Sequence, residues 1–151
     1  MKNIIKKHII LLSPTDNIVA PIQINYDDSE NTVCTIEINV TYNGVLYQGN
    51  GTNYLWEDAF ADLQNKLPHN IKLACCMTCR HGNMCPYGNS ENQLFCTKDL
   101  LINSKDDIIK LFETYPEAER IVASVDYCDD FIYQSDVYYT YNDYLYYLQK
   151  K

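Results

Sequence analysis

A cysteine-rich stretch between Leu73 and Leu100 constrains the fold of this chain more than any other feature of the sequence. It holds five of the seven cysteines. Four of them follow the spacing C-x2-C-x5-C-x10-C, namely Cys76, Cys79, Cys85 and Cys96. A C-x2-C turn aims two thiolates at one ion, and two later cysteines can complete the tetrahedral shell that zinc prefers. The spacing therefore predicts a structural zinc site in a cysteine-rich loop over 75–96, with Cys75 and His81 as spare donors.

Two other interpretations of the same cysteines stay open. Only one C-x2-C knuckle is present, whereas a pair of knuckles would be a stronger zinc signal. Cys85 precedes Pro86, a combination that also occurs at iron–sulfur ligands, so an iron–sulfur or thiol redox protein is the alternative function. In the third interpretation the thiols are unligated or disulfide-bonded, and Cys75 and Cys76 are small buried residues at the end of a strand. The region between Gly82 and Asn92 has little apolar content, so a cross-linking ion would give it a reason to be ordered.

The length and charge of the chain limit the classes of partner. With 151 residues the chain is long enough for one core, and we expect a single domain over 1–151. Its 12 basic and 20 acidic residues give a formal net charge of -8. This charge argues against direct binding to nucleic acid, which needs concentrated Lys and Arg, and against binding to an anionic membrane. A protein partner is therefore expected to be basic.

The beginning of the sequence bears on localisation. A basic opening precedes a short apolar run from Ile9 to Leu12. The run is shorter than a signal-peptide core and Pro14 interrupts it, so we interpret it as part of a first strand. No stretch approaches the roughly 20 apolar residues of a membrane helix. We expect a cytoplasmic protein, where an odd number of cysteines favours metal or free thiols over disulfides. The abundance of Asn, Ile, Lys and Tyr is typical of low-GC bacterial or phage coding sequences.

The first third of the chain predicts an antiparallel β-meander. Residues 4–12 and 18–26 read as strands separated by turn-forming residues. The next segment alternates cleanly, and one of its faces comprises Cys34, Ile36, Ile38, Val40 and Tyr42. Cys34 is therefore interpreted as a core residue and not as a ligand. Asn43-Gly44 supplies a tight hairpin turn, after which residues 45–48 return antiparallel.

A helix is expected after this hairpin. Thr52 or Asn53 can cap its start, and Pro68 ends it. Its inward stripe comprises Trp56, Ala59, Phe60, Leu63 and Leu67. Because the only tryptophan lies on this stripe, we interpret it as core packing and not as a ligand-stacking ring. A strand over 70–76 then leads into the cysteine-rich loop.

The remaining elements complete an α+β fold, an antiparallel sheet packed by helices. Ser104 and Asp107 form a capping-box variant for a second helix. Its apolar stripe comprises Ile108, Leu111, Phe112 and Tyr115. Residues 121–127 alternate as a strand, and Ser135 can cap a last helix. The stripe of that helix would comprise Val137, Tyr141, Tyr144, Leu145 and Leu148, although a strand over 135–150 stays an open alternative.

The C-terminal segment is rich in tyrosine and aspartate. Between Asp126 and Tyr147 there are eight tyrosines and five aspartates. One helix cannot turn all of these rings towards one core, so several rings are expected at the surface. Aromatic rings give contact area at low entropy cost, and carboxylates steer a basic partner. The predicted partner-binding residues are Asp129, Asp130, Asp136, Tyr138, Tyr139 and Tyr141.

The sequence offers little support for catalysis. None of the three histidines, His8, His69 and His81, lies in a nucleophile or zinc-hydrolase motif. We therefore predict no catalytic residue and no cofactor other than the metal. The predicted function is a small acidic interaction protein braced by a cysteine-bound structural zinc. An inhibitor or immunity-type protein that occludes a basic nuclease is one concrete form of this function.

Overall fold

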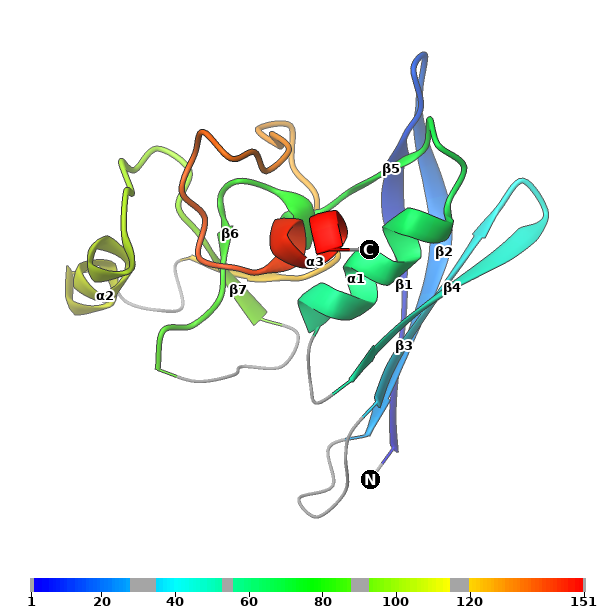
Figure 1. The fold of residues 1–151 in the computed structure, drawn as a ribbon, viewed down its shortest axis with the longest axis horizontal. Coiled ribbons are helices and arrows are strands. Elements are labelled where there is room, and N and C mark those ends of the chain that lie inside the picture. Colours follow the sequence, from blue (N-terminus) through cyan, green and yellow to red (C-terminus); the bar gives the residue numbers. More distant parts are fainter. Residues whose placement is uncertain (1, 28–34, 53–55, 88–92, 115–119, 151) are drawn as a thin grey trace. The chain divides into compact units, whose positions relative to one another are not determined.

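The fold is α+β, as the sequence patterns predict (Figure 1). The computed structural model describes residues 2–27, 35–52, 56–87, 93–114 and 120–150. The chain divides into two compact units. The first comprises Met1–Leu73 and Asp143–Lys151, and the second comprises Ala74–Asn142. The expectation of a single domain stays a prediction. None of the helices in the described ranges is long and apolar enough to cross a membrane.

The first unit is built on the predicted β-meander. Its four long strands, each antiparallel to the next, are β1 (Lys2–Leu12), β2 (Asn17–Asp27), β3 (Thr35–Tyr42) and β4 (Val45–Thr52). The short strand β5 (Lys72–Ala74) joins the sheet beside β1, which gives the order β4-β3-β2-β1-β5. The predicted hairpin turn is confirmed, because Asn43 and Gly44 have φ values of 54° and 78°, both in the region that a tight hairpin turn requires.

Alternation along the strands buries one face of this sheet. Ile36, Ile38 and Val40 of β3 are buried, and so are Ile22 and Ile24 of β2, which pair with Val40 and Ile38. Side chains that alternate in this way present a continuous apolar surface on one side and polar groups on the other. The predicted faces of β3 are therefore confirmed over the described residues.

Helix α1 (Trp56–Lys66) covers the apolar face of the sheet (Figure 1). All five residues of the predicted stripe are buried: Trp56, Ala59, Phe60, Leu63 and Leu67. The helix approaches the backbone of β4 closely, since a Cβ atom on Gly49 would lie 2.5 Å from both the Ala59 carbonyl oxygen and the Leu63 Cβ. Gly49 thus lets α1 pack directly on the strand. Of the two predicted caps, Thr52 is the last residue of β4, and Asn53 lies outside the described residues.

The interpretation of the single tryptophan as a core residue is confirmed. Trp56 is 2% exposed, and its ring lies 5.2 Å from the ring of Tyr26. Helix α3 (Tyr144–Lys150) packs against α1 in the same unit and contributes the fully buried Tyr144. Because Trp56 belongs to this core, its fluorescence reports on the packing of the first unit.

Glu57 gives the first unit a pH-dependent stability. The side chain is 8% exposed, and its carboxylate accepts a hydrogen bond from the Asp143 N–H at 3.3 Å. Burial raises the pKa of Glu57 above its ordinary value, backbone hydrogen bonds oppose the rise, and the charges of Asp143 and Asp58 add to it. The folded state therefore holds this proton more tightly than the unfolded state. This contribution is complete below the unfolded pKa and is lost as the pH rises through the folded pKa.

We expect the variant Glu57→Gln to be more stable than the natural chain at neutral pH, by up to about 1 kcal/mol, the usual size of a single-site effect. Glutamine keeps an acceptor for the Asp143 N–H but has no charge to bury, so the loss of stability between mildly acidic and neutral pH should become smaller. Urea unfolding followed by Trp56 fluorescence at both pH values measures the difference. The exposed Asp16→Asn in the same unit is the matched control, with no expected change. A Glu57→Gln variant less stable at neutral pH would contradict the argument.

The second unit holds the small sheet and the cysteine-rich region. Its elements are a 3-10 turn η1 (Cys76–Thr78), β6 (Gly82–Asn83), β7 (Gln93–Cys96), α2 (Lys105–Thr114) and β8 (Ile121–Ala123). The strands form an antiparallel sheet in the order β6-β7-β8. The predicted cap of α2 is confirmed, because the Ser104 hydroxyl accepts a hydrogen bond from the Asp107 N–H at 3.3 Å. Ile108 and Leu111 are buried as predicted, whereas Tyr115 lies outside the described residues. The predicted strand over 121–127 ends early, at Ala123.

The predicted last helix is wrong at its start. Residues 135–143 are not helical, and Val137, assigned to the apolar stripe, is 92% exposed. Tertiary hydrogen bonds within the second unit explain the difference. The Thr140 hydroxyl donates to the Arg80 carbonyl at 2.7 Å, and the Asn142 side-chain amide donates to the Gly82 carbonyl at 2.6 Å. These bonds hold the segment in a path of turns and bends that a helix could not follow.

Candidate functional site

The C-x2-C turn is tied to a distant part of the chain. The Cys76 N–H donates to the Asp126 carbonyl at 2.8 Å, and the Arg80 N–H donates to the Ile132 carbonyl at 2.8 Å. Backbone hydrogen bonds of this kind align two segments without any contribution from side-chain chemistry. The acidic segment, residues 126–136, therefore runs beside the C-x2-C turn that carries Cys76 and Cys79.

Gly82 connects the turn to the strand that carries Cys96. The Gly82 N–H donates to the Cys79 carbonyl at 3.0 Å, and Gly82 pairs with Cys96 between β6 and β7. A Cβ atom on Gly82 would collide with the Cys76 carbonyl, so only glycine permits this approach. Through Gly82, Cys96 is brought close to the C-x2-C turn, as the spacing argument requires.

Three cysteines line one cavity of about 520 Å³ in the second unit. They are Cys76, Cys96 and Cys128. Asp126 and Lys98 also line the cavity, whereas neither Cys79 nor Cys85 does. Cys128 is exposed, whereas Cys76 and Cys96 are half-buried. The cavity thus joins two of the four predicted ligands with a cysteine that the spacing argument left out.

The buried thiols of this region resist ionisation. Burial raises the pKa of Cys75 to about 12 and raises the pKa of Cys76 well above its ordinary value. Burial also raises the pKa of Cys79, and the charges of Cys96 and Cys128 add to the effect. Reactive cysteines usually have a lowered pKa, because the thiolate is the nucleophile. The thiols of Cys75, Cys76 and Cys79 therefore do not have the lowered pKa that is typical of a reactive cysteine.

The other predicted donors have different surroundings. Cys75 is buried, and its sulfur lies 3.9 Å from the Thr78 hydroxyl. The rings of His81 and Tyr138 are perpendicular to each other, at a centroid distance of 6.1 Å. The Nδ1 atom of His81 is buried with no hydrogen-bond partner among the described residues. Cys34, interpreted as a core residue, lies outside the described residues.

The metal prediction and its alternatives stay predictions. All six described cysteines have free thiols. Within the described ranges, no three or more His, Cys, Asp or Glu side chains form a group that could hold a metal ion as the side chains stand. Three predicted ligands, those of the C-x2-C turn and Cys96, are nevertheless brought together by the backbone contacts described above. The fourth, Cys85, lies beyond the end of β6.

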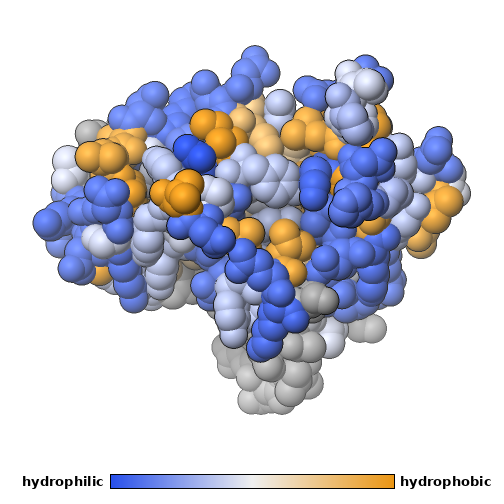
Figure 2. Space-filling model, turned by 45° about the horizontal axis from the view of Figure 1, so that its top comes forward, coloured by the Kyte–Doolittle hydropathy of each residue, from blue (hydrophilic) through white to orange (hydrophobic). Residues whose placement is uncertain are grey.

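The three predicted acidic residues project from the second unit. Asp129, Asp130 and Asp136 are all exposed. Asp130 forms an ion pair with Lys98 at 2.8 Å, but both groups are open to solvent, so the pair adds little stability. Sequence reasoning did not identify Ile132, an exposed apolar side chain in the same segment. On the face drawn in Figure 2, exposed apolar residues form separate patches among hydrophilic ones.

The three predicted tyrosines are half-buried. The Arg80 guanidinium lies over the Tyr138 ring at 4.3 Å, and the Lys105 ammonium lies over the Tyr141 ring at 5.3 Å. These contacts are cation–π interactions within the second unit. Tyr139 also has an interaction within the chain. The three tyrosine rings are therefore engaged within the chain. The carboxylates of Asp129, Asp130 and Asp136 are more accessible to a partner than these rings.

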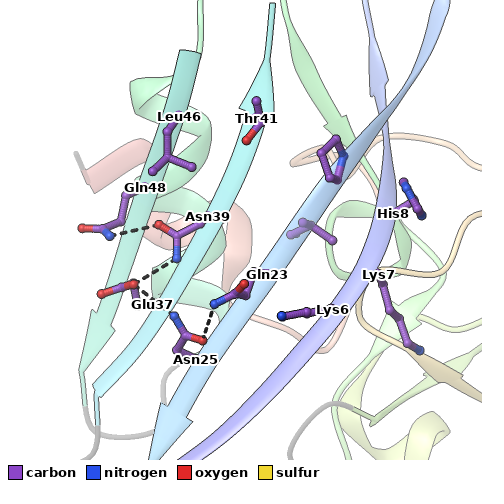
Figure 3. Close-up of a pocket in the computed structure, with 12 residues that line it drawn as sticks. Lys6, Lys7, His8, Gln23, Asn25, Glu37, Asn39, Thr41, Leu46 and Gln48 are labelled. Atoms are coloured by element: carbon purple, nitrogen blue, oxygen red, sulfur yellow. Dashed lines mark hydrogen bonds between the residues drawn. The ribbon is translucent and has the colours of Figure 1, made fainter. Parts of the chain in front are cut away.

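A second polar feature lies on the outer face of the large sheet, in the first unit (Figure 3). It is a groove of about 650 Å³. The Glu37 carboxylate accepts hydrogen bonds from Asn25 at 3.1 Å and Asn39 at 2.9 Å, and these amides accept from Gln23 and Gln48, both at 3.0 Å. The alternation of β3 predicts that Glu37 and Asn39 face away from the core. The row of side-chain hydrogen bonds across the strands also depends on strand register, which alternation does not specify. The groups largely satisfy one another.

Comparisons with known protein families and with curated proteins found no relative of this chain. No model of a known protein family matches the sequence, and no curated protein matches it. The fold and the site define an α+β protein with a cysteine-lined cavity beside an acidic segment.

Proposed function

We propose that this chain is a small acidic, non-enzymatic interaction protein in which a cysteine-bound zinc braces the segment that meets a basic protein partner. One observation carries the proposal: the acidic segment is hydrogen-bonded along the cysteine turn. Beyond the bonds at Asp126 and Ile132, the Gln134 N–H donates to the Thr78 carbonyl at 3.1 Å. The Gln134 side-chain amide also donates to the Met77 carbonyl at 2.9 Å. Whatever orders the turn therefore orders the segment.

The small size of the second sheet supports a need for such a brace. Its strands have two, four and three residues. Strands this short bury little apolar surface and supply few hydrogen bonds to offset the entropy of ordering long connections. A structural zinc contributes directly to folding, because the unfolded chain has no preformed site. Zinc would thus stabilise the second unit, whose sheet is built from short strands.

Charge supports a basic partner. The chain has a formal net charge of -8, and Asp129 and Asp130 are exposed on a segment held at both ends. Fixed carboxylates steer association with a basic surface and cost less entropy on binding than carboxylates on a mobile loop. An inhibitor or immunity-type protein that covers a basic nuclease is the concrete form of this proposal.

Charge reversal tests the acidic segment. We expect the double variant Asp129→Lys/Asp130→Lys to lose capture of a basic partner from lysate by more than about tenfold, equivalent to about 1.4 kcal/mol of binding free energy. The measurement is quantitative pull-down with the full chain at two salt concentrations, because steering by exposed charges weakens with salt.

The double variant Asp106→Lys/Glu113→Lys on α2 is the matched control, since both residues are exposed and the charge change is the same. It should capture the partner as the natural chain does. Thermal unfolding checks that both double variants are folded. Equal capture by the Asp129→Lys/Asp130→Lys variant and the natural chain would remove the acidic segment from the proposal. Equal loss in both variants would show that only net charge matters.

A further inference from the structure

Cys128 lies with the predicted zinc ligands although it is far from them in sequence. It lines the same cavity as Cys76 and Cys96. The Cys76 N–H bonds the carbonyl of Asp126, only two residues before Cys128. This backbone contact holds the backbone of Cys128 near that of Cys76, whatever rotamers the two side chains adopt.

Cys79 belongs to the same cluster. Its N–H donates to the Cys76 carbonyl at 3.3 Å, which closes the C-x2-C turn. Its carbonyl accepts from Gly82, the residue that pairs with Cys96. Cys79 does not itself line the cavity, but these backbone bonds place it in the same turn as Cys76 and next to the residue that pairs with Cys96. Four cysteines therefore converge from three separate parts of the second unit.

Cys85 is directed away from this cluster. Gly82 pairs with Cys96, and Asn83 pairs with Phe95, so β6 runs from the Cys96 end of β7 towards its opposite end. Three further residues from Gly82 to Cys85 correspond to about 10 Å of extended chain. The Met84 N–H is bonded to the Tyr141 carbonyl at 2.7 Å, which holds the chain on this path. Cys85 therefore reaches the cavity only if β6 is rebuilt.

We propose that a structural zinc ion is held by four thiolates, those of Cys76, Cys79, Cys96 and Cys128. This four-cysteine shell names the ligands of the zinc ion in the proposed function, and it therefore rests on that proposal. It differs from the shell predicted from the sequence in one ligand, because Cys128 replaces Cys85. Binding converts four thiols to thiolates and releases their protons, and the ion takes the tetrahedral geometry of four-cysteine sites with Zn–S distances of about 2.3 Å. The side chains rotate towards the cavity when the ion binds, while the backbone contacts stay as described.

The shell explains why zinc would control the acidic segment directly. Cys128 immediately precedes Asp129 and Asp130. A zinc–thiolate bond at Cys128 therefore fixes the position of the two carboxylates, and the C-x2-C turn and β7 provide the rest of the frame. With Cys85 as the fourth ligand, the ion would not touch the acidic segment at all.

Zinc affinity of matched cysteine variants tests the shell. The full chain is stripped of metal under reducing conditions, and Zn²⁺ is titrated in competition with a chromophoric chelator. We expect the natural chain and Cys85→Ser to bind about one zinc per chain with equal affinity. Cys128→Ser should bind more than about a hundredfold more weakly, because even the loss of an outer-shell partner costs tenfold to a hundredfold. Cys128→His keeps a zinc donor and should recover much of the affinity.

Cobalt provides a second readout that does not depend on stability. Co²⁺ in the natural chain should show the intense thiolate charge-transfer and tetrahedral d–d absorption of a four-thiolate site, and Cys128→Ser should show weaker charge-transfer absorption. Loss of zinc in Cys85→Ser with normal binding in Cys128→Ser would overturn the shell and leave a zinc-braced interaction protein in place. Absence of zinc binding in the natural chain would overturn both. Iron with inorganic sulfide in the purified protein would overturn zinc in favour of a cluster.

Discussion

Replacing Gly82 with alanine is expected to unfold the second unit and to abolish the proposed zinc binding. The added Cβ would collide with the Cys76 carbonyl oxygen and lie 2.9 Å from the Cys76 carbonyl carbon. Both atoms belong to the backbone, so no side-chain rotation relieves the contact. The Gly82 N–H is bonded to Cys79, and Gly82 pairs with Cys96, which prevents β6 from moving away. We expect a cost above about 3 kcal/mol, the upper end of ordinary overpacking.

Amide hydrogen exchange measures this effect by segment. Residues 93–96 and 120–134 should lose protection in Gly82→Ala, whereas the fluorescence of Trp56 should report an intact first unit. Gly44→Ala is the matched control. Gly44 has a positive φ but no atom within 4 Å of an added Cβ, so the cost should be about 1 kcal/mol, with zinc affinity unchanged. Normal protection in Gly82→Ala would show that β6 does not pack against the cysteine turn.

The parts of the fold that the sequence predicts are those set by local patterns. Alternation in β3 places Ile36 and Ile38 in the core, and the helical stripe of α1 places Phe60 and Leu63 there. Asn43-Gly44 determines the hairpin because few other residue pairs tolerate its φ values. In each case the relevant neighbours lie within a few residues, or are fixed by the two-residue period of a strand, so no tertiary information is needed.

The start of the last helix and the proposed role of Cys128 depend on distant contacts. Apolar spacing favoured a helix from Ser135, but Thr140 and Asn142 each bond a carbonyl that lies 60 residues away in sequence. Likewise, spacing within the cysteine-rich stretch selected Cys85 as the fourth ligand because it is near in sequence. The bond between Cys76 and Asp126 brings Cys128 to the cavity, and no spacing pattern encodes that bond.

Removal of zinc is expected to unfold the second unit while the first unit stays folded. Structural zinc contributes about 10–16 kcal/mol to the folding of small zinc-dependent peptides, which equals or exceeds the whole stability of an ordinary domain, about 5–15 kcal/mol. The strands β6, β7 and β8 are too short to replace a contribution of this size. Chelation of the purified full chain should therefore remove amide protection from residues 76–79 and 124–134, with no change in Trp56 fluorescence.

Restoration by metal ions distinguishes a zinc–thiolate brace from general effects of the chelator. Zn²⁺ should restore the protection and the capture of the basic partner together, because the segment that carries Asp129 and Asp130 is bonded to the cysteine turn. Ca²⁺ and Mg²⁺ should restore neither, since both prefer oxygen ligands to thiolates. Metal-free protein with full protection over 76–79 and 124–134 would show that the turn and the acidic segment order each other through backbone hydrogen bonds alone. The cysteines would then be packing residues of the second unit.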